Sequence, residues 1–258
     1  MSEKNRDGKR NARERLAVER EKQKAGEKRR RALIVGASVV CVLGLAAVIG
    51  VVAANAGKDK KSGASGPVVS PSGATGKDSL AIPVGKDSAK STLTVWEDFR
   101  CPACQAFETA YRPTIHELTD SGQLKAEYHL VTLIDGNLGG SGSLKAANAA
   151  ACAQDAGKFR DYHDVLYANQ PKETDDAFAD NAKLIELAGK VGGLDTPAFR
   201  SCVNNGTHDG WVQKSHAAFQ SNGLTGTPTV LLDGKTISAD QTMTPAKLKQ
   251  MVEAANKG

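Results

Sequence analysis

The chain has 258 residues, of which 40% are hydrophobic and 24% are charged, and this composition excludes collagen-like and fully disordered proteins. All 12 aromatic residues lie at or after Trp96, so the folded core is expected in the last two-thirds of the chain. Residues 1–31 contain 13 Lys and Arg against 6 Asp and Glu, whereas the rest contains 21 against 23. A nucleic-acid-binding domain carries positive charge on its folded part, so we expect no nucleic-acid partner.

An uncharged, apolar run of 23 residues at 32–54 is long enough to cross a bilayer as a helix. It follows a basic tail that ends in Lys-Arg-Arg-Arg, and the positive-inside rule places this tail, residues 1–31, in the cytoplasm. We therefore predict a signal-anchor: one transmembrane helix in the cell membrane with the C-terminal part outside. The alternatives are a signal peptide cleaved after the Ala-Asn-Ala at 54–56 and, more weakly, a twin-arginine signal.

The next segment, residues 55–79, is rich in Gly, Ser, Lys and Asp and contains Pro67 and Pro71. This composition is typical of a flexible linker. The linker would hold a folded domain, residues 80–258, close to the membrane surface.

A short β-branched segment at 91–96 predicts a strand, and a Cys-Pro-Ala-Cys motif follows it closely. Beyond the motif, apolar residues recur at helical spacing, at Phe107, Ala110, Tyr111, Ile115 and Leu118. Pro102 suits a first helical turn, where its missing amide costs no intrahelical bond. The sequence therefore places Cys101 at the N-terminus of a helix.

This position has chemical consequences for Cys101. The partial positive charge of a helix N-terminus favours a thiolate, and Cys-X-X-Cys cysteines in such places have pKa values of about 3.5–7.5. A low pKa makes Cys101 a reactive nucleophile and a good leaving group, and Cys104 can then resolve the mixed disulfide. Half of a zinc site is the alternative, but the chain has no second Cys-X-X-Cys motif, and we expect no metal.

A second motif, Gly226-Thr227-Pro228-Thr229, precedes a predicted strand, an Asp-Gly turn and a short strand at 235–238. A final helix is predicted at 245–255. Together with Cys101-Pro102-Ala103-Cys104 after a strand, these features resemble the DsbA-like branch of the thioredoxin-fold disulfide oxidoreductases. The resemblance covers about residues 80–258.

The resemblance implies an α/β, thioredoxin-like fold with a helical insertion at about 140–222. It implies that Cys101 and Cys104 are catalytic without a cofactor. It further implies that Thr227–Pro228 is a cis peptide bond that faces the cysteines and presents backbone to an extended substrate. Many relatives have a buried acid six residues before the first Cys, where this chain has Val95, so Glu97 becomes the candidate for proton transfer.

The predicted insertion holds two further cysteines, Cys152 and Cys202. Four cysteines outside the membrane allow three pairings. Adjacency favours Cys101–Cys104, which leaves Cys152–Cys202 as a structural disulfide. Glycines separate the candidate helices of the insertion, which are 144–155, 159–169, 178–191, 197–204 and 209–222.

The five histidines show no metal-ligand spacing and are expected on the protein surface or on helix faces; they are His116, His129, His163, His208 and His216. The resulting hypothesis is a tethered thiol–disulfide oxidoreductase that acts on cysteines of exported proteins and is reset by a redox partner in the same membrane. Disulfide formation is the preferred direction. A thiol reductase or disulfide isomerase with the same cysteines, and a non-catalytic binding module, are the alternatives.

Overall fold

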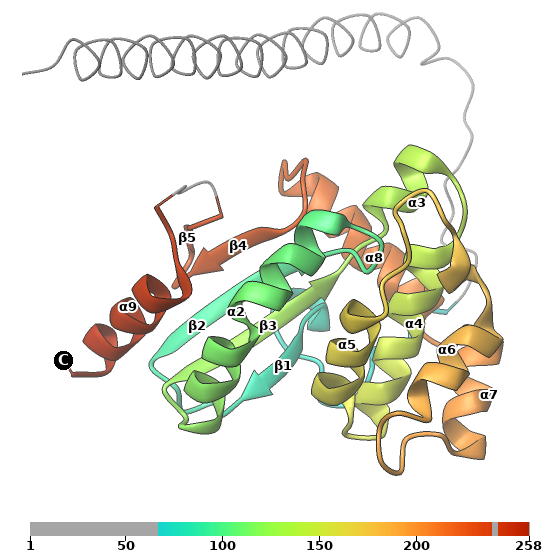
Figure 1. The fold of residues 1–258 in the computed structure, drawn as a ribbon, viewed down its shortest axis with the longest axis horizontal. Helices are drawn as coiled ribbons and strands as arrows, with labels where there is room; N and C mark the ends of the chain where they lie inside the picture. Colours follow the sequence, from blue (N-terminus) through green and yellow to red (C-terminus); the bar gives the residue numbers. More distant parts are fainter. Residues whose placement is uncertain (1–66, 239–241, 258) are drawn as a thin grey trace, which may run out of the picture. The chain divides into compact units, whose positions relative to one another are not determined.

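A computed structural model describes residues 67–238 and 242–257, in which helices cover a mixed β-sheet (Figure 1). The predicted basic tail (1–31), membrane span (32–54) and first part of the linker (55–66) lie outside the described residues. No helix within the described ranges combines the length and the apolar character needed to cross a membrane.

The sheet has five strands in the order β1-β3-β2-β4-β5. Their bounds are β1 Ile82–Gly85, β2 Ser91–Glu97, β3 Leu124–Leu130, β4 Thr229–Leu232 and β5 Lys235–Thr236. Strands β2 and β3 are parallel and are joined by helix α2 (Pro102–Asp120), as a parallel pair requires a crossover connection. The other neighbours are antiparallel. Strand β2 lies between β3 and β4, so the chain enters α2 from the middle of the sheet.

Alternation along β2 distributes its side chains between the two faces of the sheet. Leu93 and Val95 belong to the main core, which also contains Ile115 and Leu118 of α2. Trp96 belongs to a second, smaller cluster and packs against Phe219, with 5.9 Å between the ring centroids. The C-terminal helix α9 (Pro245–Lys257) contacts α2 and β2. Apolar packing on both faces therefore fixes the end of β2, from which the active-site motif continues.

Between β3 and β4 the chain forms the predicted helical insertion, which occupies one end of the sheet (Figure 1). Its helices are α3 Leu133–Leu138, α4 Gly142–Asp155, α5 Phe159–Ala168, α6 Asn181–Ala188, α7 Pro197–Asn205 and α8 Asp209–Ser221. Helix α4 contacts α5, α7 and α8, and its alanines from Ala146 to Ala153 are fully buried. A helix with such small side chains on several faces can be surrounded by neighbours, and α4 is the central helix of the insertion.

The helix predicted at 178–191 is shorter in the structure. A 3₁₀ turn (Ala177–Ala179) comes first, and α6 begins only after Asp180. The Asp180 carboxylate accepts a hydrogen bond from the Ala182 amide, and this capping bond sets the start of α6.

A disulfide between Cys152 and Cys202 joins α4 to α7. The Cα atoms are 5.9 Å apart, and the two cysteines are 50 residues apart in the sequence. In the chain-entropy model, closing a loop of this length stabilises the fold by about 4 kcal/mol.

The segment before β1 is bound to the insertion. The Ser72 amide donates a hydrogen bond of 2.7 Å to the Asp155 carboxylate, and the Trp211 indole donates one of 2.7 Å to the Ser79 carbonyl. These residues fall in the predicted linker, 55–79. The ordered domain thus extends further towards the N-terminus than the expected boundary, because polar partners on α4 and α8 bind the backbone of this segment.

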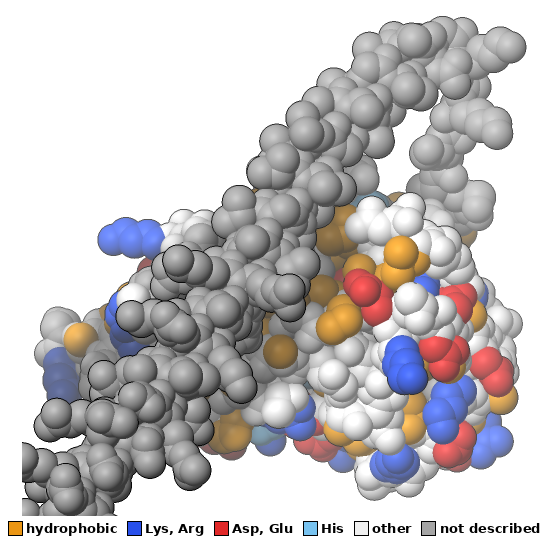
Figure 2. Space-filling model, turned by 45° about the horizontal axis from the view of Figure 1, so that its top comes forward, with side chains coloured by type: hydrophobic (Ala, Val, Ile, Leu, Met, Phe, Trp, Pro, Cys, Tyr) orange, Lys and Arg blue, Asp and Glu red, His pale blue; other side chains and the backbone are white. Residues whose placement is uncertain are grey.

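The surface carries charges of both signs. Figure 2 shows Lys and Arg side chains next to Asp and Glu side chains on one face of the domain. This mixture follows from the near-equal numbers of acidic and basic residues that the sequence has after residue 31.

Candidate active site

Two free cysteines lie where β2 passes into α2. Cys101 is the N-cap residue of α2, Pro102 is its first helical residue, and Cys104 lies in its first turn. The Cys101 side chain is 6% exposed, whereas Cys104 is fully buried. The amide of Cys101 donates to the Asp98 carbonyl at 3.0 Å, which closes the turn between the strand and the helix. Cys101 is therefore the sulfur that a partner can reach.

The surroundings of Cys101 favour its thiolate. The Cys104 thiol, which donates a hydrogen bond to it, is the main cause that lowers the pKa of Cys101 to about 6. Burial raises the pKa of Cys101 and so opposes this shift, whereas the backbone amides of Ala103 and Cys104 at the start of α2 lower the pKa further. Cys101 is thus largely ionised at neutral pH.

The neighbouring Cys104 behaves in the opposite way. Burial raises the pKa of the Cys104 thiol well above its usual value, and the negative charges of Cys101 and Glu97 raise it further. The two sulfurs of one motif therefore take different protonation states. Cys101 can attack or leave as a thiolate, whereas Cys104 retains its proton.

A loop far along the chain faces Cys101. Thr227–Pro228 is a cis peptide bond immediately before β4. Sγ of Cys101 lies 3.3 Å from the carbonyl oxygen of Thr227, to which the protonated form of the thiol donates a hydrogen bond, although 126 residues separate the two in sequence. The sheet brings these residues together because β4 is hydrogen-bonded to β2 in an antiparallel register.

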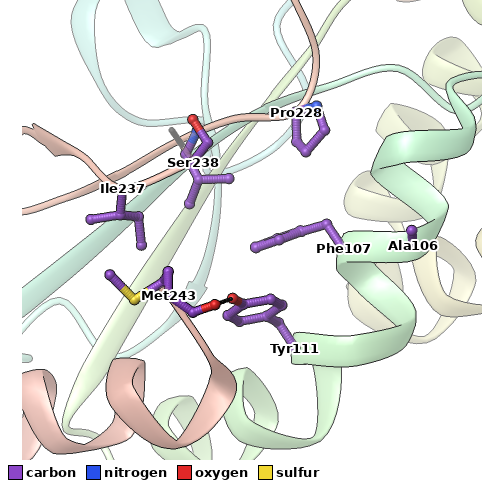
Figure 3. Close-up of a pocket in the computed structure, with 8 residues that line it drawn as sticks. Ala106, Phe107, Tyr111, Pro228, Ile237, Ser238 and Met243 are labelled. Atoms are coloured by element: carbon purple, nitrogen blue, oxygen red, sulfur yellow. Dashed lines mark hydrogen bonds between the residues drawn. The ribbon is translucent and has the colours of Figure 1, made fainter. Parts of the chain in front are cut away.

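A largely apolar pocket of about 320 Å³ lies beside this loop (Figure 3). Its lining comes from α2, from the β4–β5 region and from the segment before α9, and consists of Ala106, Phe107, Tyr111, Pro228, Val230, Ile237, Ser238 and Met243. The rings of Phe107 and Tyr111 stack with 4.6 Å between centroids, and the Tyr111 hydroxyl donates to the Met243 carbonyl. These contacts fix the positions of the two aromatic rings that line the pocket.

The residue before Cys101 is a buried arginine. The Arg100 side chain is 2% exposed and forms ion pairs with Asp135 at 2.7 Å and Asp176 at 2.9 Å. It also donates to the carbonyls of Gly139 and Glu173. Arg100 thereby fastens the segment next to Cys101 to helix α3 and to the segment between α5 and α6. Local sequence patterns do not reveal this role of Arg100, since both acidic partners are distant in the chain.

The acid proposed from the sequence, Glu97, is the last residue of β2 and is 1% exposed. It accepts a hydrogen bond of 2.8 Å from Nε2 of His163 on α5. Glu108, one helical turn after Cys104, is also 1% exposed. The expectation that all five histidines lie on the surface or on helix faces is wrong for His129, which is buried on strand β3, and for His208, which is the buried N-cap residue of α8. His163 lies on a helix, α5, but its side chain is buried. Glu108 follows Cys104 by four residues, and this helical spacing predicts that both side chains lie on the same face of α2.

Comparison with known proteins points to redox enzymes. The profile of a family described as thioredoxin matches residues 77–254. Disulfide bond formation protein D of Bacillus subtilis is 27% identical over 180 residues, which cover 68% of this chain and 77% of that protein. Among solved structures, oxidised DsbA from Mycobacterium tuberculosis is 31% identical with a TM-score of 0.59, over 68% of this chain and 92% of that one.

A second solved structure from Mycobacterium tuberculosis, the reduced form of the disulfide bond oxidoreductase DsbG, is 30% identical with a TM-score of 0.60. The match covers 69% of this chain and 88% of that one. The residues that the family profile matches, 77–254, include the cysteine motif, the cis-proline loop and the insertion between them.

Proposed function

The chain belongs to the DsbA-like thiol–disulfide oxidoreductases of the thioredoxin family, and from this premise we propose that it forms disulfides in exported proteins. The low pKa of Cys101 beside a protonated Cys104 is the observation that carries this direction. A stabilised thiolate favours the reduced enzyme, and an enzyme whose reduced form is stabilised is a strong oxidant.

The proposed reaction starts from a Cys101–Cys104 disulfide. A substrate thiolate attacks Sγ of Cys101, the bond to Cys104 breaks, and the electron pair leaves with Cys104, which takes up a proton. A second substrate thiolate then attacks the substrate sulfur of the mixed disulfide. The substrate disulfide forms, and Cys101 leaves as the thiolate that the start of α2 stabilises.

Thr227 and Pro228 are the proposed substrate-binding residues. The Thr227 carbonyl lies 3.3 Å from the Cys101 sulfur, where it can accept a hydrogen bond from the backbone of an extended substrate in place of the thiol. The adjacent pocket is apolar and large enough for one side chain. We therefore propose that the substrate places an apolar side chain in this pocket, close to its reacting cysteine.

The reduction potential of the Cys101–Cys104 pair, equilibrated with glutathione, tests the direction. A potential of about −120 mV is expected for a disulfide-forming enzyme. A potential of about −270 mV would contradict the proposal and would indicate that the protein is a thioredoxin-like reductant.

The location is proposed from the N-terminal sequence. An apolar run at 32–54 after a strongly basic tail supports a membrane anchor with the catalytic domain outside the cytoplasmic membrane. A redox partner that reoxidises the cysteines would then lie in the same membrane. Protease added to intact spheroplasts is expected to digest the domain, while a cytoplasmic marker protein stays intact. Protection of the domain until the cells are lysed would refute this topology.

A further inference from the structure

The buried guanidinium of Arg100 lies between the active-site turn and the helical insertion. Its four partners come from two parts of the insertion, namely helix α3 with the glycine that follows it, and the segment between α5 and α6. Removing a guanidinium and two carboxylates from water is costly, and a buried ion pair is weak evidence for a gain in stability. No step of the proposed exchange reaction involves Arg100 directly.

The two carboxylates that pair with Arg100 also cap helix α4. Four consecutive amides at the start of this helix donate to them, those of residues 141 and 142 to Asp176 at 3.0 and 2.8 Å, and those of residues 143 and 144 to Asp135 at 2.9 Å. The first amides of a helix have no partner within the helix, so these bonds satisfy groups that would otherwise be unpaired. Through the two carboxylates, Arg100 is attached to the central helix of the insertion.

The backbone of Arg100 belongs to the turn that leads from β2 to Cys101. Its amide donates a hydrogen bond of 2.8 Å to Oδ1 of Asp98, and Oδ2 of this fully buried carboxylate accepts one of 2.9 Å from the amide of Ile134 on α3. Both the backbone and the side chain of Arg100 are therefore bound to the α3 region. Consecutive Cα atoms are about 3.8 Å apart, so a fixed Arg100 leaves the Cα atom of Cys101 little freedom to move.

The segment between α5 and α6 binds the active-site turn at a second point. The side-chain amide of Gln170 donates two hydrogen bonds, of 2.9 Å to the Phe99 carbonyl and of 3.0 Å to the Cys101 carbonyl. Asp176, which pairs with Arg100, lies in the same segment. One stretch of the insertion thus holds three consecutive residues of the turn, 99–101.

The position of Cys101 controls how strongly its thiolate is stabilised. The Cys104 thiol is the main group that lowers the pKa of Cys101, and the first amides of α2 add to its effect; all of them act through hydrogen bonds. Hydrogen bonds weaken steeply outside a narrow range of distance and angle, so a small displacement of the Cys101 sulfur reduces this stabilisation. A less stable thiolate means a less stable reduced enzyme, which is then a weaker oxidant.

We propose that Arg100 is a positioning residue that holds Cys101 against the start of α2 and thereby sets the oxidising power of the Cys101–Cys104 pair. The inference rests on the proposed function. Arg100 exchanges no proton and no electron, and it acts through the geometry of the turn while Asp135 and Asp176 hold its guanidinium in place. The planar fork of a guanidinium binds several acceptors at once in fixed directions, so a lysine is not equivalent at this position.

The test uses the full-length protein and its Arg100→Lys variant, which keeps the positive charge but loses the fork. Two quantities are measured: the equilibrium constant for reduction of the Cys101–Cys104 disulfide by glutathione at pH 8, and the midpoint pH for alkylation of reduced Cys101 by iodoacetamide. The midpoint, about pH 6 in the wild type, should rise by about one pH unit. The equilibrium constant should fall about tenfold, because one pH unit in the pKa corresponds to a tenfold change in the stability of the thiolate.

Asp176→Asn is the second variant, because its side chain is 31% exposed and its amide oxygen can still accept a hydrogen bond from α4. It should change both quantities in the same direction by a smaller amount. In the double variant the two effects should not add, because both act through one guanidinium. Arg200→Lys is the matched control. Arg200 is 54% exposed, pairs with Asp195 at 2.6 Å and does not belong to the active-site turn, so both quantities should keep their wild-type values.

A purely structural role of Arg100 would lower the urea concentration at which the variant unfolds and leave both quantities unchanged, and this result would overturn the inference. Additive effects in the double variant, or an equal effect of Arg200→Lys, would also overturn it. If Arg100→Lys does not fold, Asp176→Asn must still move both quantities together. The wild-type equilibrium constant tests the proposed function separately. A value typical of a thioredoxin-like reductant contradicts the proposed direction, whereas the ratio of variant to wild type still reports on Arg100.

Discussion

Replacing Cys101 by serine is expected to abolish oxidation of a dithiol peptide, reducing the rate to that of the uncatalysed reaction. A hydroxyl group cannot form the mixed disulfide, and Cys101 is the sulfur of the motif that is partly exposed. Cys104→Ser should behave differently. When oxidised glutathione is supplied, the Cys101 thiolate of this variant attacks one glutathione sulfur and releases the other glutathione as a thiolate, but no Cys104 is present to resolve the mixed disulfide. The glutathione adduct on Cys101 should therefore accumulate and be detected by mass spectrometry.

The second cysteine pair provides the control for this experiment. Cys152 and Cys202 already form a disulfide within the insertion. A Cys152→Ala/Cys202→Ala protein should be less stable but should still oxidise the peptide. Activity that persists in Cys101→Ser and disappears in the Cys152/Cys202 variant would mean that the redox centre has been assigned to the wrong pair.

The reactivity of Cys101 is expected to follow a titration with a midpoint near pH 6. An ordinary cysteine has a pKa of 9.0, whereas the Cys104 thiol and the amides of α2 lower the pKa of Cys101 to about 6. Alkylation by iodoacetamide should therefore be half-maximal near pH 6, and thiolate absorbance at about 240 nm should rise over the same interval. In a Cys104→Ser protein the serine hydroxyl replaces the Cys104 thiol as the hydrogen-bond donor to Cys101. The midpoint of the Cys101 titration should therefore change, but Cys101 should still form a thiolate.

The same pKa predicts how the stability of the reduced protein depends on pH. The pKa of Cys101 is lower in the folded than in the unfolded state, so its contribution is complete above about pH 9 and is lost as the pH falls through about 6. As the pH rises from about 6 to about 9, the folding equilibrium constant of the reduced protein should increase by at most about tenfold per pH unit. The oxidised protein has no such thiolate. Urea unfolding of both forms at pH 5, 7 and 9 measures the difference, and parallel curves would contradict the assignment.

Many elements of the domain could be predicted because their signals are local. Pro102 at the first helical position and the apolar spacing after it predict α2, and the β-branched run at 91–96 predicts β2 within one residue. Strand β3, Leu124–Leu130, received no assignment although its burial alternates. It is recognised as a strand through its parallel pairing with β2, which is distant in sequence.

Local patterns in the chain suffice to predict the family resemblance, the order of the motifs and the placement of Cys101 at a helix N-terminus. These features depend on capping, helix periodicity and turn residues, which act over a few positions. The surroundings of the cysteines, in contrast, follow from the packing of distant segments. His163 meets Glu97 across 66 residues, and Arg100 meets Asp135 of helix α3 and Asp176 of the segment between α5 and α6. Such contacts depend on how the insertion packs against the sheet, and that packing has no periodic signature in the chain.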